Sequence, residues 1–245
     1  MSSSLLRVLG YPLDLCRGLL DLLLPPACAV CEALLDAPGE VLCPDCLAEL
    51  APLGGAACAR CGLPGADPCP ACRGEPGPLA LLRAGWAYEG ALQQAVLRMK
   101  LGRRIELAEA LGARLAALAL PGWDWPALDL VVPVPLHARR LHARGFNQAA
   151  VIARALTRRH GLPLSLDHLV RPRSTPEQAR APDRAARRAN VRGAFAVRSG
   201  HPFGGKLVAL VDDVITTGAT LEAAAEALLA AGAREVRGLA VARTL

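Results

Sequence analysis

Two adjacent carboxylates, Asp212 and Asp213, are the side chains of this sequence that most clearly indicate chemistry. They follow a short apolar run, Val208–Val211, of the kind expected in a strand that is buried on both faces. A threonine-rich turn comes next and opens a segment over 221–231 that we predict to be a helix. Ligands bind open α/β sheets at the carboxyl ends of the strands. The two carboxylates are therefore predicted to lie at a binding edge.

The turn after the carboxylates supplies groups that suit a phosphate. Its residues combine hydroxyls with a glycine whose backbone can approach a ligand, and they are Thr216, Thr217, Gly218, Ala219 and Thr220. A phosphate at the helix start would meet unpaired N–H groups and the positive end of the helix dipole. The same residues could merely cap a strand and a helix, but consecutive carboxylates after a buried strand are costly without a partner. The pattern therefore favours a ribose 5-phosphate site.

Eight of the nine cysteines form four Cys-x-x-Cys pairs. The paired residues are Cys28, Cys31, Cys43, Cys46, Cys58, Cys61, Cys69 and Cys72. Two residues between thiols place both sulfur atoms on one side of a tight turn, as tetrahedral zinc requires. Redox chemistry would call for a single pair on a βα unit, and a disulfide scaffold for a secretory signal. We predict two structural zinc sites of four thiolates each; sequential and cross-braced pairing both satisfy the spacing.

Charge is distributed unevenly along the 245 residues. Residues 1–79 carry a net charge of −5, whereas residues 80–245 carry +11. The segment 139–198 holds 14 arginines against three acids and accounts for the excess. A basic segment opposite a phosphate loop suits a polyanionic ligand, and nucleic acid would satisfy it as well. Because 26 of the 28 basic residues are arginine, which resembles a coding bias, a solvated basic surface is the competing interpretation.

The chain is predicted to have three parts. Residues 1–26 are predicted to form an amphipathic helix, because charged residues interrupt its leucines. Those charges argue against a membrane span and a secretory signal. Residues 27–73 would form a double zinc-ribbon module, and residues 80–245 an α/β domain that follows a linker rich in proline and glycine. We expect a cytoplasmic protein, with a peripheral position at the inner face of the membrane as the alternative.

The α/β part is predicted to consist of strands that alternate with helices around a parallel sheet. A strand over 84–88 precedes helical residues 92–118, which are expected to break at Gly102. A further strand covers 128–134, and the strand over 235–242 is expected to complete the sheet.

Two donor-rich segments are predicted to face the acidic pair. The first is a loop over 136–148 at the carboxyl edge of the sheet, and the second is a long polar loop over 171–197 that could close as a lid. With Lys100, one of two lysines, the candidates for binding pyrophosphate or for catalysis are Pro135, Arg139, Arg140, Arg144, Asn147, Gln148, Arg173, Gln178, Arg187 and Asn190. An ordinary solvent-exposed lysine on a helix, with no role in binding, is an equally good interpretation of Lys100.

The run VDDVITTGAT at 211–220 closely resembles the phosphoribosyl pyrophosphate (PRPP) loop of type I phosphoribosyltransferases. In that family the two acids hold the ribose 2′- and 3′-hydroxyls, and the turn cradles the 5′-phosphate. The resemblance implies a type I phosphoribosyltransferase fold. It also implies that Asp212 and Asp213 bind ribose, that residues 216–220 bind phosphate, and that PRPP binds with Mg²⁺.

Four blocks occur in the same order as in the ComF/GntX family. They are the cysteine module, PVPLHARRLHARGFNQ at 133–148, the STPEQ to RRANVRGAF segment at 174–195, and the VDDVITTGAT loop. That family fuses a zinc module to a phosphoribosyltransferase-type domain and is associated with natural competence. The resemblance implies a role in DNA uptake, with single-stranded DNA, an uptake helicase and other competence proteins as partners. An active phosphoribosyltransferase of nucleotide or amine metabolism, without a DNA role, is the alternative.

Overall fold

The structure is a computed structural model of the chain. It describes residues 25–37, 39–53, 57–65, 69, 72, 77–173 and 193–245. Nearly all of the predicted N-terminal helix, and the lid candidates Gln178, Arg187 and Asn190, lie outside these residues. Within the described ranges, no helix has both the length and the apolar character needed to cross a lipid bilayer.

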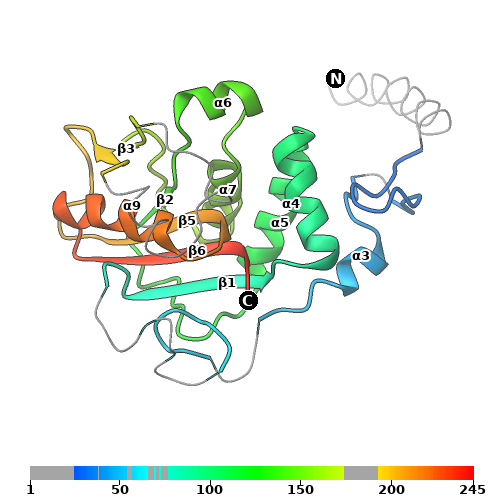
Figure 1. The fold of residues 1–245 in the computed structure, drawn as a ribbon, viewed down its shortest axis with the longest axis horizontal. Coiled ribbons are helices and arrows are strands. Elements are labelled where there is room, and N and C mark those ends of the chain that lie inside the picture. Colours follow the sequence, from blue (N-terminus) through cyan, green and yellow to red (C-terminus); the bar gives the residue numbers. More distant parts are fainter. Residues whose placement is uncertain are drawn as a thin grey trace, which may run out of the picture.

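A four-stranded parallel sheet forms the centre of the α/β part (Figure 1). Its strands lie in the order β1 (Leu81–Ala87), β6 (Glu235–Arg243), β5 (Leu207–Ile215) and β2 (Leu130–Pro133). All neighbouring pairs run parallel, which confirms the predicted α/β class. The final strand does not lie at an edge, because β6 pairs with both β1 and β5. A short antiparallel pair is formed by β3 (Leu169–Val170) and β4 (Ala196–Val197).

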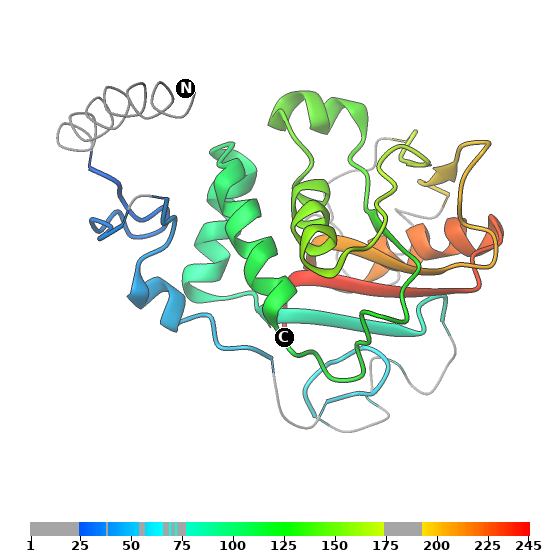
Figure 2. The same ribbon diagram turned by 180° about the vertical axis from the view of Figure 1, so that it is seen from behind.

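Helices cover both faces of the sheet (Figures 1 and 2). One face carries α4 (Gly90–Leu101), α5 (Ile105–Ala117) and α7 (Gln148–His160). The other face carries α9 (Ala219–Ala230). The predicted break at Gly102 is confirmed, because α4 ends immediately before this residue.

Residues of β5 alternate between the two cores. Ala209 and Val211 pack with α4, α5 and α7, whereas Val208 and Leu210 pack with α9. Successive side chains of a strand point to opposite faces of its sheet. The apolar run before the carboxylates is therefore buried on both faces, as its composition predicts.

The strand β5 is longer than the sequence pattern indicates. It continues through both carboxylates to Ile215, whereas the apolar run ends at Val211. The reason is its neighbour: β6 is equally long and pairs with Asp212, Val214 and Ile215. The carboxylates therefore belong to the last part of the strand and are held by the sheet rather than by a loop.

The donor-rich segment after β2 is helical where a loop is predicted. Residues Ala138–Arg144 form α6. His137 Nδ1 accepts a hydrogen bond of 3.2 Å from the Arg139 N–H and caps the start of this helix. Gly145 ends it in the left-handed conformation, with φ 82°. Both capping signals are local, so the sequence itself contains the information for this helix.

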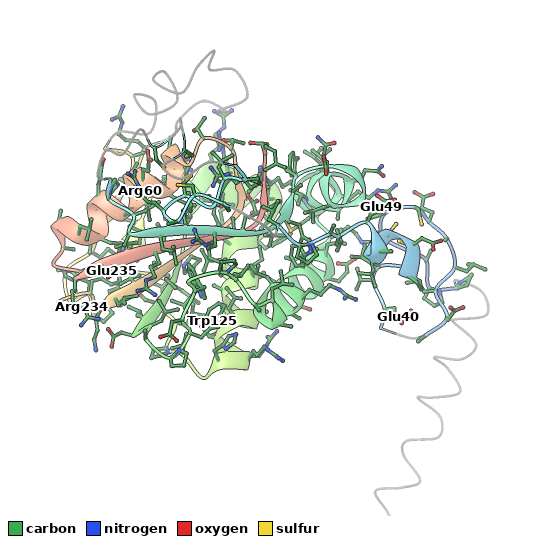
Figure 3. All side chains as sticks on the ribbon, turned by 90° about the horizontal axis from the view of Figure 1, so that it is seen from below. Glu40, Glu49, Arg60, Trp125, Arg234 and Glu235 are labelled. Carbon is green, nitrogen blue, oxygen red and sulfur yellow. The ribbon has the colours of Figure 1, made fainter. Side chains whose placement is uncertain are left out.

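The first part of the cysteine-rich segment packs against α4. It contains the short helix α3 (Pro44–Ala48), and its apolar residues share a core with Leu92 and Ala95. Glu49, which is labelled in Figure 3, lies where this part meets α4 and accepts a hydrogen bond of 2.8 Å from the Ala91 N–H. Its carboxylate thus caps the start of α4 from a distant part of the chain.

The second part of the cysteine-rich segment lies along β1, an edge strand of the sheet. The Leu53 N–H donates to the Gly85 carbonyl at 2.9 Å, and the Leu82 N–H donates to the Arg60 carbonyl at 2.7 Å. Covering an edge in this way protects its unpaired backbone groups. These bonds connect the module to the sheet, and the division into domains at 73 and 80 stays a prediction.

Candidate functional site

A pocket of about 510 Å³ lies at the carboxyl ends of β2 and β5. It is lined by residues that are distant in sequence and come from α4, α6, α7, β5, the start of α9 and the segment that follows β2. Of the predicted site residues, it brings together Lys100, Arg140, Arg144, Asn147, Gln148, Asp212, Asp213, Thr216 and Thr220. The structure thus collects acids, cations, amides and hydroxyls around one space.

Lys100 contacts the acidic pair directly. Its Nζ lies 3.1 Å from Oδ2 of Asp213, and the two side chains are 22% and 12% exposed. An ion pair this well covered is screened far less than a surface pair. Lys100 is therefore part of the pocket and not a solvated helix lysine.

The Asp212 carboxylate is difficult to keep ionised in the unliganded protein. Burial raises its pKa to about 7, and the neighbouring Asp213 carboxylate adds to the rise. A hydrogen bond of 2.8 Å from the Asp213 N–H to Asp212 Oδ1, together with Lys100 and Arg171, acts in the opposite direction. Ligand groups that donate hydrogen bonds, such as ribose hydroxyls, would favour the ionised form.

Four cations line the described pocket, against two carboxylates. They are Lys100, Arg140, Arg144 and Arg171, so the pocket carries a charge of about +2 when both acids are ionised. Arg171 is a residue that the sequence analysis missed. It is buried, and its guanidinium carbon lies 5.2 Å from the ring centroid of Phe195. The abundance of arginine between 139 and 198 hides it in the sequence.

The two predicted amides have different environments. Asn147 holds the fold together, because its Nδ2 donates to the Val134 carbonyl at 3.0 Å and its Oδ1 accepts from the Ala149 N–H at 3.1 Å. Gln148 is 1% exposed, and its Nε2 has no hydrogen-bond partner in the part of the chain that the structure describes. An unpaired buried donor costs about 1–3 kcal/mol. A ligand oxygen that accepted from Gln148 would remove this cost.

The turn between β5 and α9 has the geometry expected of an anion site. Gly218 adopts φ 84°, which a residue with a Cβ atom rarely adopts. Thr217 Oγ1 accepts a hydrogen bond of 3.4 Å from the Ala219 N–H, while Thr216 and Thr220 line the pocket. The N-terminus of α9 therefore opens beside the carboxylates, with its partial positive charge.

Some predicted residues do not line the pocket. Pro135, Arg139 and Arg173 are described but are absent from its lining, as are Thr217, Gly218 and Ala219 of the turn. The lining also has an apolar wall that the sequence analysis did not identify, formed by Tyr88, Leu97, Leu101 and Leu136. Tyr88 follows β1, so its approach to the pocket depends on strand order, which no local signal reveals.

The eight paired cysteines form two clusters. The first cluster is Cys28, Cys31, Cys43 and Cys46, and the second cluster is Cys58, Cys61, Cys69 and Cys72. Within each, the sulfur atoms lie within 4.8 Å of one another, and all eight thiols are free. The pairing is therefore sequential, and the cross-braced alternative is excluded.

The cluster geometry fits zinc. Tetrahedral zinc with bonds of about 2.3 Å to sulfur separates its sulfur atoms by about 3.8 Å. The Sγ atoms are 3.5 Å apart between Cys31 and Cys43, and 3.9 Å apart between Cys58 and Cys72. Burial acts to raise the pKa of Cys28, but backbone N–H donors, among them the Cys43 N–H at 3.3 Å, outweigh it and lower the pKa to about 6. Each cluster is thus a structural zinc site.

Comparisons with known proteins match both parts of the chain. A double zinc ribbon domain matches residues 19–74, and a phosphoribosyl transferase domain matches residues 142–244. Among solved structures, glutamine phosphoribosylpyrophosphate amidotransferase from B. subtilis matches with 26% identity and a TM-score of 0.36. That match covers 54% of this chain and 25% of the other.

Curated relatives cover most of the chain. The DNA utilization protein YhgH of Escherichia coli K12 is 34% identical over 77% of this chain and 84% of its own length. Competence protein F of Haemophilus influenzae is 32% identical over 68% of each chain. Competence protein ComFC of Bacillus subtilis is 27% identical over 80% of each. With its double zinc ribbon followed by a phosphoribosyltransferase domain, the chain belongs to the ComF/GntX family of competence and DNA utilization proteins.

Proposed function

We propose that the chain binds PRPP, together with Mg²⁺, in the pocket at the end of β5, and that it does so as part of a role in DNA uptake or utilization. The observation that supports PRPP binding most is the meeting of an acidic pair, a helix N-terminus and four cations around one pocket. A ribose carrying phosphates at two positions presents matching groups. Hydroxyl donors suit the carboxylates, and the phosphates suit the turn and the cations.

Each group of residues has a separate task in this proposal. Asp212 and Asp213 accept hydrogen bonds from the ribose hydroxyls, and the turn over 216–220 holds the 5′-phosphate. Arg140, Arg144 and Arg171 neutralise the pyrophosphate, and the buried Nε2 of Gln148 donates to one of its oxygens. The carboxylates fit the oxygen ligands that Mg²⁺ prefers. A bound Mg²⁺ would supply further neutralisation of the pyrophosphate.

The same arrangement could support transfer of the phosphoribosyl group. A nucleophile would form its bond to ribose C1 while the bond to pyrophosphate breaks and its electron pair leaves with the pyrophosphate oxygen. Arginines aimed at that oxygen stabilise the developing charge. An active phosphoribosyltransferase of nucleotide or amine metabolism would release pyrophosphate from PRPP when its acceptor, a nucleobase or an amine, is added. A coupled pyrophosphate assay over nucleobases and amines tests this alternative.

Calorimetry with PRPP and Mg²⁺ tests the binding proposal. The parent chain is expected to bind, and Asp213→Asn is expected to weaken binding by at least about tenfold, since it removes a charged acceptor. Asp129→Asn is the matched control, because Asp129 precedes β2 at the opposite end of the sheet and accepts from the Leu207 N–H. No heat of binding with the folded parent chain would refute the proposal.

A basic helix supports the proposed contact with single-stranded DNA. Helix α6 carries Arg139, Arg140 and Arg144, has no buried residue, and extends away from the sheet beside the pocket (Figure 1). Arg139 is exposed, and Arg140 and Arg144 are half-buried. Arginines that solvent can reach bind phosphates and make the affinity depend on salt.

Fluorescence anisotropy with a labelled oligothymidine at several salt concentrations measures this contact. Replacing the three α6 arginines by glutamine is expected to reduce both the affinity and the salt slope, by about 0.7 per lost phosphate contact. The control replaces Arg154, Arg158 and Arg159 of α7, which are exposed and lie outside the lining of the pocket. Equal losses in both variants would contradict a specific role for α6.

Two further expectations stay predictions. They are the docking of an uptake helicase on the zinc ribbon and a cytoplasmic location, either free or at the inner face of the membrane.

A further inference from the structure

The second cluster sits against two buried arginines that the proposed function does not use. Arg83 of β1 is 8% exposed, and Arg243, the last residue of β6, is 5% exposed. Guanidinium groups keep their proton under all ordinary conditions. Two positive charges are therefore held inside the protein, where an uncompensated charge is strongly unfavourable.

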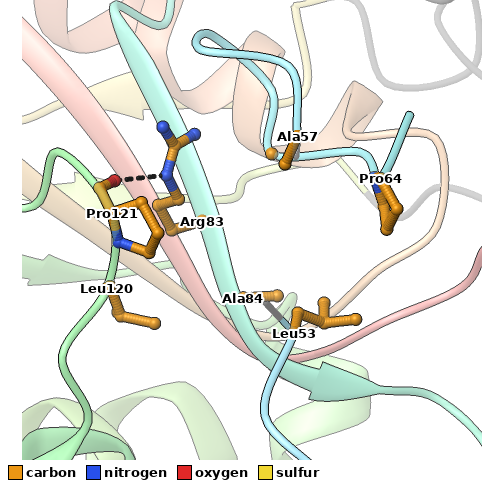
Figure 4. A pocket seen from close by; sticks show the side chains of 8 residues that line it. Leu53, Ala57, Pro64, Arg83, Ala84, Leu120 and Pro121 are labelled. Atoms are coloured by element: carbon orange, nitrogen blue, oxygen red, sulfur yellow. Dashed lines mark hydrogen bonds between the residues drawn. The ribbon is translucent and has the colours of Figure 1, made fainter. Parts of the chain in front are cut away.

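Arg83 joins three segments of the chain through backbone carbonyls. Its Nε donates to the Pro121 carbonyl at 2.6 Å, and its Nη2 donates to the Ala59 carbonyl at 2.7 Å. Figure 4 shows this side chain between Pro121 and the segment that contains Ala57 and Pro64. Ala59 lies directly after Cys58, so Arg83 holds the turn that carries the first thiols of the second cluster.

The backbone of the same turn meets β1 at short range. Gly62, directly after Cys61, adopts φ 68°, and a Cβ atom there would lie 2.9 Å from the Leu82 carbonyl oxygen. Only glycine allows this approach. The second cluster is therefore built onto the edge strand, and both guanidinium groups donate to backbone carbonyls of the turn that carries Cys58 and Cys61.

Arg243 links the second cluster to the strand that carries the acidic pair. Its Nη1 donates to the Cys61 carbonyl. Its backbone lies opposite Ile215 of β5 in the sheet register, and the Thr244 N–H donates to the Ile215 carbonyl at 2.9 Å. Ile215 is two residues beyond Asp213. One side chain and two hydrogen-bonded strands thus separate the metal site from the pocket.

The charges of the metal site and the arginines balance. Four thiolates around Zn²⁺ carry −2, and the two guanidinium groups carry +2. When a chelator removes the zinc, the turns that carry the thiols lose the ion that holds them, and the Ala59 and Cys61 carbonyls that accept from the two arginines lie in these turns. Both buried guanidinium groups would then lose the charged site against which they are fixed. The arginine beside the first cluster does not depend on zinc in this way. Arg98 is 39% exposed and pairs with Glu32, the residue after Cys31, at 3.0 Å.

We propose that Arg83 and Arg243 are positioning residues that act as counterions of the second cluster, so that its zinc is a structural part of the sheet carrying the pocket. Loss of zinc from the second cluster loosens β1, β6 and the end of β5. Loss of zinc from the first cluster does not. The two zinc sites of one ribbon module therefore have different roles.

Stepwise chelation of the full chain tests the proposal. Native mass spectrometry counts the zinc ions while hydrogen exchange reports on peptides covering β1 and β5. Zinc is expected to dissociate in two phases, a fast one from the first cluster and a slow one from the second. The Cys31→Ser variant disables the first cluster and is therefore expected to show the slow phase alone. Amide exchange in β1 and β5 should rise with the slow phase alone. Equal release rates, or loss of the second zinc with unchanged protection of β5, would overturn the proposal.

Substitutions separate charge from packing. Arg243→Met is expected to speed the slow phase by at least about tenfold, because breaking a buried charge pair is strongly destabilising. Arg243→Lys, which keeps the charge, should restore most of the slow rate, and Arg98→Met should change neither phase. An unchanged slow phase in Arg243→Met would refute the counterion role. If that variant does not fold, the exchange experiment on the parent chain still decides. None of these measurements involves PRPP, so they are independent of the proposed function.

Discussion

Replacing Asp212 by asparagine is expected to stabilise the unliganded protein while it removes a ligand contact. Burial, with the Asp213 carboxylate beside it, raises the pKa of Asp212 from 3.8 to about 7. A shift of about 3 units corresponds to about 4 kcal/mol of preference for the neutral form. The asparagine Oδ1 can still accept the hydrogen bond from the Asp213 N–H. At pH 8 the variant should therefore be more stable than the parent by up to about 4 kcal/mol.

The stability gain of the Asp212→Asn variant over the parent is expected to grow as the pH rises. Between pH 3.8 and about 7 the folded parent holds a proton on Asp212 that the unfolded chain has released. Its free energy of unfolding therefore falls as the pH rises through this window. The asparagine variant has no such group. Its advantage should be less than half as large at pH 5 as at pH 8, because part of the window then remains uncrossed.

Urea denaturation at pH 8 and pH 5, followed by circular dichroism, measures both quantities. Asp129→Asn is the control of opposite sign, because a hydrogen bond from the Leu207 N–H lowers the pKa of Asp129. That variant should lose the same stability at pH 8 and at pH 5, because both values lie above the ordinary pKa of 3.8 and the stabilisation by Asp129 fades only below it. If Asp212→Asn is less stable than the parent at pH 8, or if its advantage does not change with pH, the reasoning about this acidic pair is wrong.

Three further substitutions test separate parts of the structure. Gly218→Ala should cost about 1–2 kcal/mol in urea denaturation because φ is 84° there, whereas Gly204→Ala, which has open space around it and no positive φ, should cost little. Gln148→Leu should leave thermal stability unchanged or raised, since it removes a buried amide nitrogen that has no partner within the described ranges, yet weaken PRPP binding in calorimetry; lower stability with unchanged binding would contradict this. Glu49→Gln should lower stability by about 0.5–1 kcal/mol, because it removes a charged cap from the start of α4, and Glu40→Gln on an exposed position is its control.

Contiguous signals in the sequence predicted the chemistry of the site. Asp212, Asp213 and the turn over 216–220 are adjacent along the chain, so their order already indicates a strand, an anion site and a helix. The cysteine spacing predicted two zinc sites for a similar reason, because each Cys-x-x-Cys pair is a local turn. The sequential pairing of the cysteines needed the structure, since spacing alone admits a second arrangement.

Residues whose role depends on strand order were missed. Tyr88 reaches the pocket because it follows β1, which runs parallel to β5, and Arg171 reaches it because it follows β3 of the short antiparallel pair. Nothing near either residue in the sequence indicates this. Helix α6 was missed for a different reason, since its caps, His137 and Gly145, are visible in the sequence. A helix cap is a local contact that neighbouring residues specify, whereas contacts between distant segments leave no local signal.

The sequence by itself determined the kinds of group that this protein presents: an acidic pair before an anion-binding turn, arginines in excess, and thiols spaced for zinc. Only the tertiary structure decided which groups act together. It joined Lys100 to Asp213 at 3.1 Å, left the Gln148 Nε2 without a partner among the described residues, and placed Arg83 and Arg243 against the second cluster. The physical reason is that charge and hydrogen bonding act over a few ångströms in space, whatever the separation along the chain.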